Sequence, residues 1–244
     1  MSLKNKTYHF EQGEVLLINK PFKWTSFDAV NKIRWLLQKK LGLKNLKVGH
    51  AGTLDPLATG LLIICTGKFT KRIDEFQAYQ KEYTGTITLG STTPSFDLET
   101  QINERFEFGH IDEASIRETT KKFLGETLQT APLFSAKKID GVRAYKIARR
   151  GQEAEIKPNK IEISEFNITE IRMPEVDFKI TCSKGTYIRS IANDFGKYLN
   201  NGAHLSVLCR TKIGSFDLND SIDMKEFETM ILEIADQKNA GIID

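Results

Sequence analysis

The chain has 244 residues, 40% of them hydrophobic and 27% charged, with a formal net charge of +3. This composition is ordinary for a globular protein with a sizeable core, and no apolar run reaches membrane-spanning length. The first residues lack the apolar segment of a signal peptide, so we expect a cytoplasmic protein. The three cysteines (Cys65, Cys182, Cys209) and four histidines are scattered, which predicts reduced core cysteines and no metal site.

The predicted elements follow from apolar spacing and from helix and turn signals. In chain order they are a strand at 14–19, a helix capped by Thr25 or Ser26 and ended by Gly42, a buried strand at 61–65, a helical turn near 71–76, a strand at 81–89, a polar loop at 90–110, an amphipathic helix at 112–124, a short basic helix at 144–150, strands at 161–171 and 176–182, a helix after Gly185, a strand at 207–216 and a last helix through Phe227 and Ile234.

Strands and helices interleave without the regular alternation of a doubly wound sheet, and no internal repeat is present. This pattern predicts an α+β fold around a mixed, mostly antiparallel sheet with flanking helices. In the helix at 112–124 we expect Ile116, Phe123 and Leu124 to share the apolar side. Residues 126–140 carry few signals for regular structure.

Residues 49–60 are the most informative segment of the chain. They read Gly-His-Ala-Gly-Thr-Leu-Asp-Pro-Leu-Ala-Thr-Gly and hold one carboxylate, Asp55. Pro56 keeps Asp55 out of helical geometry, and the glycines permit sharp turns or close approach of another chain segment. A lone acid on a stiff loop that leads into a buried strand suits a fixed reactive group. Asp-Pro beside glycines is also common turn chemistry, and on the tripeptide alone the structural interpretation is favoured.

The whole twelve-residue string resembles the catalytic loop of the tRNA pseudouridine-55 synthases, the bacterial TruB family, at every fixed position. Further segments resemble that family in the same order along the chain, over about residues 14–216. They are Lys20-Pro21, Lys81-Glu82-Tyr83, Gln129–Lys138 with Gly141–Tyr145, Ser183–Ser190, and Gly202–Leu205 followed by Leu208–Thr211. The resemblance implies the pseudouridine synthase fold with a thumb insertion at about 126–151.

The resemblance also implies a reaction and the residues that carry it. Pseudouridine forms when the C1′–N1 bond of a uridine breaks and C1′ joins C5 of the same base, so no cofactor is expected. Asp55 would act as nucleophile at C1′ or as the base that removes the 2′ proton. Arg189 would hold Asp55 ionised and aimed. Tyr83 would stack on the flipped uracil or carry a proton at C5.

Other residues are expected to bind RNA. Tyr187 would pack beneath the base or ribose, and Leu208 would close the apolar side of the pocket. His50 would contact RNA or a neighbouring flipped base, or else bond a loop carbonyl. Lys20 would support the loop that carries Tyr83 or Asp55. The thumb would grip phosphate through Lys138, Arg143, Arg149 and Arg150, although a solvated helix face is the common fate of such a charge run.

The sequence departs from the family pattern at three points, one of which is Ala131 in place of the first proline of the thumb's Pro-Pro pair. Many members carry a C-terminal RNA-binding PUA domain, whereas here residues 219–244 suggest a short helical segment after a catalytic domain at 1–218. In the loop at 90–99 only Thr93 and Asp97 of the family pattern survive, and Pro94 replaces an acid.

We therefore expect an isomerase that converts uridine 55 in the T-loop of tRNA by flipping the base, and that works as a monomer without metal. Two alternatives keep the chemistry and change the substrate. The enzyme would act on another tRNA site, or it would be an RNA-guided enzyme of the same superfamily. The lack of a PUA domain argues against guidance. A non-catalytic tRNA-folding chaperone is a further alternative, against which Asp55, Tyr83 and Arg189 argue together.

Overall fold

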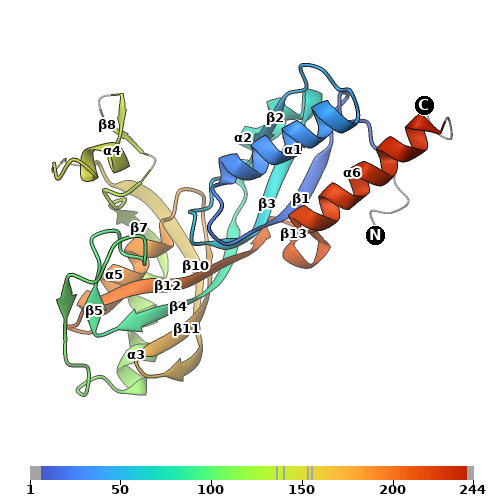
Figure 1. Ribbon diagram of the computed structural model, residues 1–244. Coiled ribbons are helices and arrows are strands. Elements are labelled where there is room, and N and C mark those ends of the chain that lie inside the picture. Colours follow the sequence, from blue (N-terminus) through green and yellow to red (C-terminus); the bar gives the residue numbers. More distant parts are fainter. Residues whose placement is uncertain (1–6, 136, 140, 153, 155, 241–244) are drawn as a thin grey trace. The chain divides into compact units, whose positions relative to one another are not determined.

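The structure is a computed structural model that describes residues 7–240 except 136, 140, 153 and 155 (Figure 1). The chain forms two compact units. The terminal unit combines Met1–Tyr79 with Cys209–Asp244, and the central unit is Gln80–Leu208. Strand β12 (Ala203–Ile213) contains the second boundary, so its first residues belong to the central unit and its last to the terminal unit.

The terminal unit is built on a small sheet. Its middle strand β3 (Thr59–Thr66) pairs antiparallel with β1 (Val15–Lys20) and with β2 (Val48–His50). It also pairs in parallel with β12 at Cys209 and Arg210. The run Leu61-Leu62-Ile63-Ile64-Cys65 is fully buried, as its continuous apolar character predicts for a strand covered on both faces.

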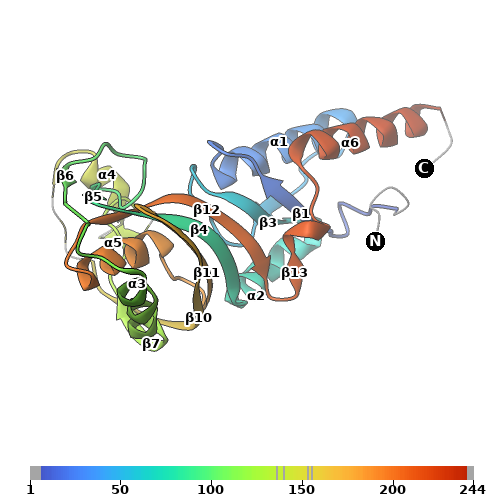
Figure 2. The ribbon, with the colours of Figure 1, turned by 90° about the horizontal axis from the view of Figure 1, so that it is seen from below.

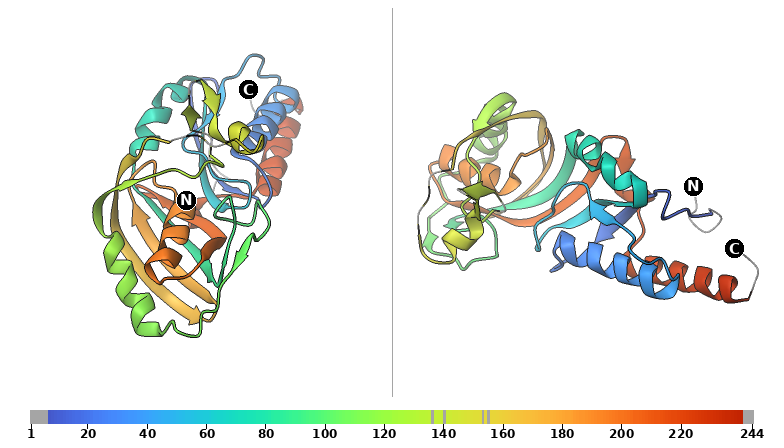
Figure 3. Two further views of the ribbon diagram at one scale, coloured as in Figure 1. Left: turned by 90° about the vertical axis from the view of Figure 1, so that its left-hand side faces the viewer. Right: turned by 90° about the horizontal axis from the view of Figure 1, so that it is seen from above.

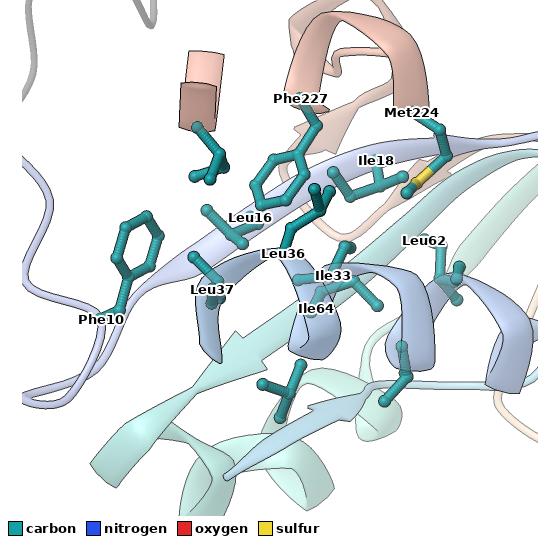
Figure 4. Packing of buried hydrophobic residues seen from close by; sticks show 14 of the residues in the cluster. Phe10, Leu16, Ile18, Ile33, Leu36, Leu37, Leu62, Ile64, Met224 and Phe227 are labelled. Atoms are coloured by element: carbon teal, nitrogen blue, oxygen red, sulfur yellow. The ribbon is translucent and has the colours of Figure 1, made fainter. Parts of the chain in front are cut away.

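Two helices, α1 (Ser26–Lys40) and α6 (Met224–Asn239), cover one face of this sheet and lie side by side (Figures 1 and 3). Between them and the sheet lies an apolar core in which Ile33 and Leu36 of α1 meet Ile18 of β1, Leu62 of β3 and Phe227 of α6 (Figure 4). The helix α1 begins at a capping box, because Thr25 accepts from the Asp28 amide while the Asp28 carboxylate accepts from the Thr25 amide.

The other face of the sheet is covered by shorter elements: the 3₁₀ turn η2 (Gly67–Arg72), α2 (Ile73–Ala78), the strand β13 (Phe216–Asp217) and the turn η4 (Leu218–Asp220). Phe76 of α2 packs edge-on against Phe216. The helix predicted near residues 71–76 and the strand predicted at 61–65 are both present.

The central unit is an antiparallel sheet of long strands. In spatial order the strands are β12, β4 (Lys81–Leu89), β11 (Glu175–Cys182), β10 (Asn159–Arg172) and β7 (Gly125–Gln129). The sheet curves around helix α5 (Ile188–Tyr198), as Figures 2 and 3 show. Phe195 of α5 contacts the rings of Phe123 and Phe166, which fixes the helix against the concave face.

Helix α3 (Glu113–Thr120), capped by Asp112, continues into the turn η3 (Lys121–Phe123) and packs against β10. The prediction that Leu124 joins Ile116 and Phe123 on the apolar side is wrong. Leu124 is 48% exposed, because the helix ends at Thr120 and its spacing no longer applies at 124.

The central unit also contains regular structure that the sequence did not predict. Residues 125–129 form β7 at the sheet edge, where every side chain but Gln129 is exposed, so no apolar alternation marks the strand. The loop at 90–110 contains the two-residue strands β5 (Ser91–Thr92) and β6 (Glu104–Arg105). These are too short for any periodic signal.

The segment predicted as a thumb contains β8 (Lys138–Ile139), β9 (Val142–Arg143) and α4 (Ala144–Ala148). Ala144 is fully buried against Ala131 and Ile156, which form a small apolar cluster at its base. The α+β prediction with a mostly antiparallel sheet is confirmed. Among the residues that the structure describes, no helix is long and apolar enough to cross a membrane.

Of the three cysteines, Cys65 and Cys182 are buried and Cys209 is half-buried, and all three are free thiols. The prediction of reduced cysteines in the core therefore holds fully for two of them.

Candidate active site

Asp55 lies in the loop that joins β2 to β3 in the terminal unit, and its side chain is half-buried. The Asp55 carbonyl accepts a hydrogen bond from the Ala58 amide (3.1 Å), which closes a turn around Pro56. Gly60, where the loop enters β3, has φ +103°, and a Cβ there would lie 2.4 Å from the Arg210 carbonyl oxygen. Only glycine fits this close parallel approach of β12.

Ser26, the first residue of α1, holds the loop one residue before Asp55. Its hydroxyl accepts from the Leu54 amide (2.8 Å) and donates to the Leu54 carbonyl (3.1 Å), and the side chain is buried. The start of α1 therefore fixes the backbone beside the carboxylate. The sequence indicated Ser26 only as a possible helix cap, a position that Thr25 occupies.

Lys20 holds the loop on the other side of Asp55. The fully buried ammonium donates to the carbonyls of Pro21 (2.9 Å), Trp24 (2.6 Å) and Pro56 (3.4 Å). The Lys23 amide also donates to the Pro56 carbonyl, at 2.8 Å. Lys20 was expected to support the loop that carries Tyr83 or the loop that carries Asp55. These contacts involve the Asp55 loop.

Arg210 is a third support that the sequence analysis did not identify as a site residue. It is 1% exposed and lies in β12. Its guanidinium donates to the carbonyls of Leu61 (2.8 Å), Gly52 (3.1 Å) and Thr53 (3.5 Å), and so ties both ends of the loop to the sheet. The one signal in the sequence was its place in the Leu-x-Arg-Thr segment.

These groups set the electrostatics around the loop. Burial lowers the pKa of Lys20 to about 8, with the Arg210 charge acting in the same direction and the Asp55 charge opposing it. Burial, followed by the Arg210 charge, lowers the pKa of His50, so this imidazole is neutral at pH 7. The buried Nδ1 of His50 has no hydrogen-bond partner in the described part of the chain.

Arg189 lies in the first turn of α5, in the central unit, and is buried. One guanidinium nitrogen donates to the carbonyls of Phe134 (2.9 Å) and Ser95 (3.2 Å), and Nε lies 3.6 Å from the Asp97 carboxylate. The surviving Asp97 of the loop at 90–99 thus contacts the predicted catalytic arginine, which gives that loop a place at the site.

The other predicted residues of the central unit lie near the same sheet. Tyr83 is a buried residue of β4 opposite Ile180 of β11, and Leu208 is a buried residue of β12. Tyr187 precedes α5 and exchanges two hydrogen bonds with the Gln129 side chain, through its amide (2.8 Å) and its carbonyl (3.0 Å). These bonds fix its backbone at the end of β7.

The predicted phosphate-binding residues of the thumb differ in their surroundings. Arg143 and Arg150 are exposed. Arg149 pairs with Glu99 at 2.9 Å and lies over the Tyr145 ring. Lys138 lies in β8, and its side chain is outside the described part of the structure.

The structure therefore groups Lys20, His50 and Asp55 in the terminal unit, and Tyr83, Tyr187, Arg189 and Leu208 in the central unit. The pairing of Asp55 with Arg189 stays a prediction. Among the described residues no group of three or more His, Cys, Asp or Glu side chains could hold a metal ion.

Comparisons with known proteins place this combination of sheet and loop among the pseudouridylate synthases. The model of the TruB family pseudouridylate synthase N-terminal domain matches residues 38–188, and that of the tRNA pseudouridylate synthase B C-terminal domain matches 189–242. The chain belongs to the TruB family.

Curated relatives agree with the family models. The chain is 61% identical to the tRNA pseudouridine synthase B of Flavobacterium johnsoniae over 218 residues, which cover 89% of this chain and 95% of that protein. It is 47% identical to the protein of the same name from Chloroherpeton thalassium, over 94% of this chain and 95% of that protein.

Among solved structures, a chain of a Cbf5-Nop10-Gar1 complex superposes with a TM-score of 0.70 at 27% identity. The match covers 97% of this chain and 58% of that one, so this protein spans little more than half the length of that structural neighbour. The likeness confirms the predicted pseudouridine synthase fold.

Proposed function

We propose that this protein converts uridine to pseudouridine in tRNA, at position 55 of the T-loop, with Asp55 as the essential carboxylate. The observation that carries the proposal is the loop 49–60, which matches the catalytic loop of the family at every fixed position and is bonded from three sides. The relatives at 61% and 47% identity bear the name tRNA pseudouridine synthase B.

In the proposed reaction the C1′–N1 bond of the target uridine breaks, the uracil rotates, and C1′ joins C5. The proton on C5 leaves and N1 ends with a proton, so atoms and electrons balance within the substrate. Asp55 either attacks C1′ or removes the 2′ proton, and both routes need an ionised carboxylate in a fixed place. Ser26, Lys20 and Arg210 provide that placement by bonding the backbone on either side of it.

The central unit supplies the groups that handle the base. A base that undergoes chemistry must leave the helical stack, and single-stranded RNA bases are held on aromatic faces. We assign Tyr83 to stack on the flipped uracil or to move the C5 proton, with Tyr187 and Leu208 lining the pocket. Arg189, held by Ser95, Asp97 and Phe134, pairs with Asp55 in this proposal.

The T stem-loop is the proposed binding partner, engaged by a monomer. The exposed cations Arg143 and Arg150 suit phosphate contacts, whose affinity depends on salt. Specificity then comes from the shape of the loop and from flipped bases more than from reading of base edges. His50, neutral at pH 7, suits a hydrogen bond to RNA rather than an ion pair.

The test is pseudouridine mapping by carbodiimide-dependent primer extension on an unmodified tRNA transcript. We expect a stop at T-loop uridine 55 with the parent protein and none with Asp55→Asn. That variant should bind tRNA within about tenfold of the parent, or roughly 1.4 kcal/mol, because the carboxylate acts in chemistry more than in binding.

Other outcomes point elsewhere. A stop at a different uridine keeps the chemistry and overturns the substrate. Tight tRNA binding with no primer-extension stop at any uridine favours the alternative of a non-catalytic tRNA-folding chaperone. If Asp55→Asn loses binding as fully as it loses activity, the assigned role of Asp55 is wrong.

A further inference from the structure

The turn between β1 and α1 and the first turn of α1 each display an aromatic side chain to solvent. Phe22 is 54% exposed and Phe27 is 60% exposed, which makes them the two most exposed aromatic residues in the part of the chain that the structure describes. Single exposed apolar residues are normal on protein surfaces. Two exposed rings so close in sequence call for a physical reason, and Phe22 is the one that lies in the turn itself.

The turn is joined directly to the loop that carries Asp55. The Lys23 amide donates to the Pro56 carbonyl at 2.8 Å, and Lys20 bonds the carbonyls of Pro21, Trp24 and Pro56 together. The backbone on both sides of Phe22 and Lys23 is therefore fixed relative to the residue that follows Asp55. Any group bound on this turn is positioned relative to the carboxylate.

Lys23 has a backbone conformation that is unfavourable for a residue with a side chain. Its φ is +67°, in the left-handed region where a side chain is strained and glycine is not. Three other described non-glycine residues have positive φ. Asn45 and Asn200 are of a type that tolerates this region, whereas Phe96 is not. Strained positions of this kind concentrate at functional sites, which makes the Lys23 side chain a candidate for a functional role.

The two side chains of the turn complement a nucleotide. The Lys23 ammonium lies 5.7 Å from the centroid of the Phe22 ring, and it makes no ion pair with the residues that the structure describes. A ring offers a stacking surface to any base, and an unpaired ammonium offers a charge to phosphate. Stacking a base on Phe22 orders no further backbone, because the backbone of the turn is already fixed by hydrogen bonds.

We propose that Phe22 and Lys23 bind the substrate RNA directly, at a nucleotide that neighbours the target uridine. Phe22 stacks on its base and Lys23 pairs with its phosphate. This inference rests on the proposed function, since it takes RNA as the substrate of the Asp55 loop.

The test is the dissociation constant for an unmodified tRNA transcript, measured in the Asp55→Asn background at several salt concentrations. Phe22→Ala should raise the constant about tenfold, as expected for the loss of one stacked base, and Phe22→Trp should restore it to within about threefold. Lys23→Gln should lower the salt slope by about one.

Trp35 provides a matched control. It is 48% exposed on α1, and the Lys32 ammonium lies 5.4 Å from its ring centroid, so it matches Phe22 as an exposed ring beside a lysine. Lys32 differs from Lys23 in that it pairs with Glu228 at 2.7 Å. Trp35→Ala should change the dissociation constant by less than about twofold. Lys23→Gly removes the ammonium and the backbone strain together. Its melting temperature should equal or exceed that of the parent, whereas its affinity for tRNA should fall. A loss of affinity in this variant therefore does not come from unfolding.

Two results would overturn the inference: a Phe22→Ala constant within twofold of the parent, or an equal loss in Trp35→Ala. Failure of the proposed function looks different. In that case the parent protein with Asp55 intact forms no pseudouridine, whatever happens at Phe22.

Discussion

Asp55 illustrates how single residues depend on neighbours that are remote in sequence. Its loop contains no cation and no hydroxyl next to the carboxylate, yet Ser26, Lys20 and Arg210 bond the backbone at Leu54, Pro56 and Thr53. Each of these three side chains is buried. A buried polar group without its partner costs about 1–3 kcal/mol, so these contacts couple the loop geometry to the stability of the terminal unit.

Replacement of Ser26 tests this coupling. Ser26→Ala removes both hydrogen bonds to Leu54 and should lower the free energy of unfolding by about 1–3 kcal/mol. It should also lower kcat more than it changes the affinity for tRNA, because the loop loses its anchor beside Asp55. Unfolding in urea and single-turnover kinetics measure the two effects.

Thr25→Ala is the control for this variant. It removes the helix cap at the neighbouring position and should cost a similar 0.5–2 kcal/mol or so in stability. In the part of the chain that the structure describes, the Thr25 hydroxyl bonds Asp28 and not the loop, so kcat should stay near that of the parent. Equal loss of kcat in both variants would mean that general destabilisation, and not loop placement, explains the Ser26 effect.

Lys20 makes the stability of the protein depend on pH in a defined direction. Its pKa is about 8 in the folded protein against an ordinary value of 10.5, so between these values the unfolded chain binds more protons. The free energy of unfolding should therefore rise with pH in this range, by about 2 kcal/mol from pH 8 to pH 10. Below pH 8 this contribution stays at its low, constant value.

Comparison with Lys20→Met isolates the effect, since other lysines and tyrosines titrate in the same range. The unfolding free energy of the parent minus that of the variant should increase with pH above 8. A difference that stays flat from pH 8 to pH 10 would show that the folded-state pKa of Lys20 is not depressed.

At the scale of elements, short segments around the central sheet surround the predicted site residue Arg189. The first turn of α5 holds Arg189, the loop at 90–99 supplies Ser95 and Asp97, and the thumb supplies the Phe134 carbonyl. The thumb is connected to the same loop through the Arg149–Glu99 ion pair. Loop and thumb are therefore coupled through two arginines, one buried and one exposed.

This arrangement predicts unequal roles for the two neighbouring arginines of the thumb. Arg150→Gln should weaken tRNA binding and lower the salt slope by about one, as the loss of one phosphate contact requires. Arg149→Gln should have a smaller effect, since Arg149 must leave Glu99 before it binds phosphate. Binding isotherms between low and moderate salt measure the slopes.

Glu99→Gln completes this test. It releases Arg149 and should strengthen tRNA binding, with a steeper salt slope than the parent. If the slope is unchanged in all three variants, Arg149 and Arg150 do not bind the RNA.

On the scale of the whole molecule, the predicted catalytic residues come from both compact units, with Asp55 in the terminal unit and Tyr83 and Arg189 in the central unit. The reaction that they are proposed to perform moves one bond within the substrate and adds no atom. Pseudouridine formation should therefore persist in excess EDTA and without any added cofactor.

The EDTA experiment uses tRNA annealed beforehand, so that loss of RNA folding is not mistaken for loss of catalysis. Single-turnover rates with and without EDTA should agree within about twofold. A loss that only a divalent metal restores, with the RNA fold intact, would contradict the proposed chemistry.

The sequence by itself determined the fold class and the order of the major helices and strands, and it indicated residues 49–60 as the candidate catalytic loop. Apolar periodicity and caps are local, so α1, β3, β4 and α5 could be located without a structure. The string around Asp55 is specific because a reacting group needs several fixed neighbours in one short segment. The edge strand β7 gave no such signal, because its exposed residues follow no alternation.

Only the tertiary structure decided which distant residues support the loop. Ser26 appeared as a helix cap and Arg210 as one residue of a motif, and their hydrogen bonds join segments 28 and about 150 positions apart in sequence. It also showed Asp97 beside Arg189 and Glu99 beside Arg149. Such contacts arise when separate elements pack together, and no local pattern of residues encodes them.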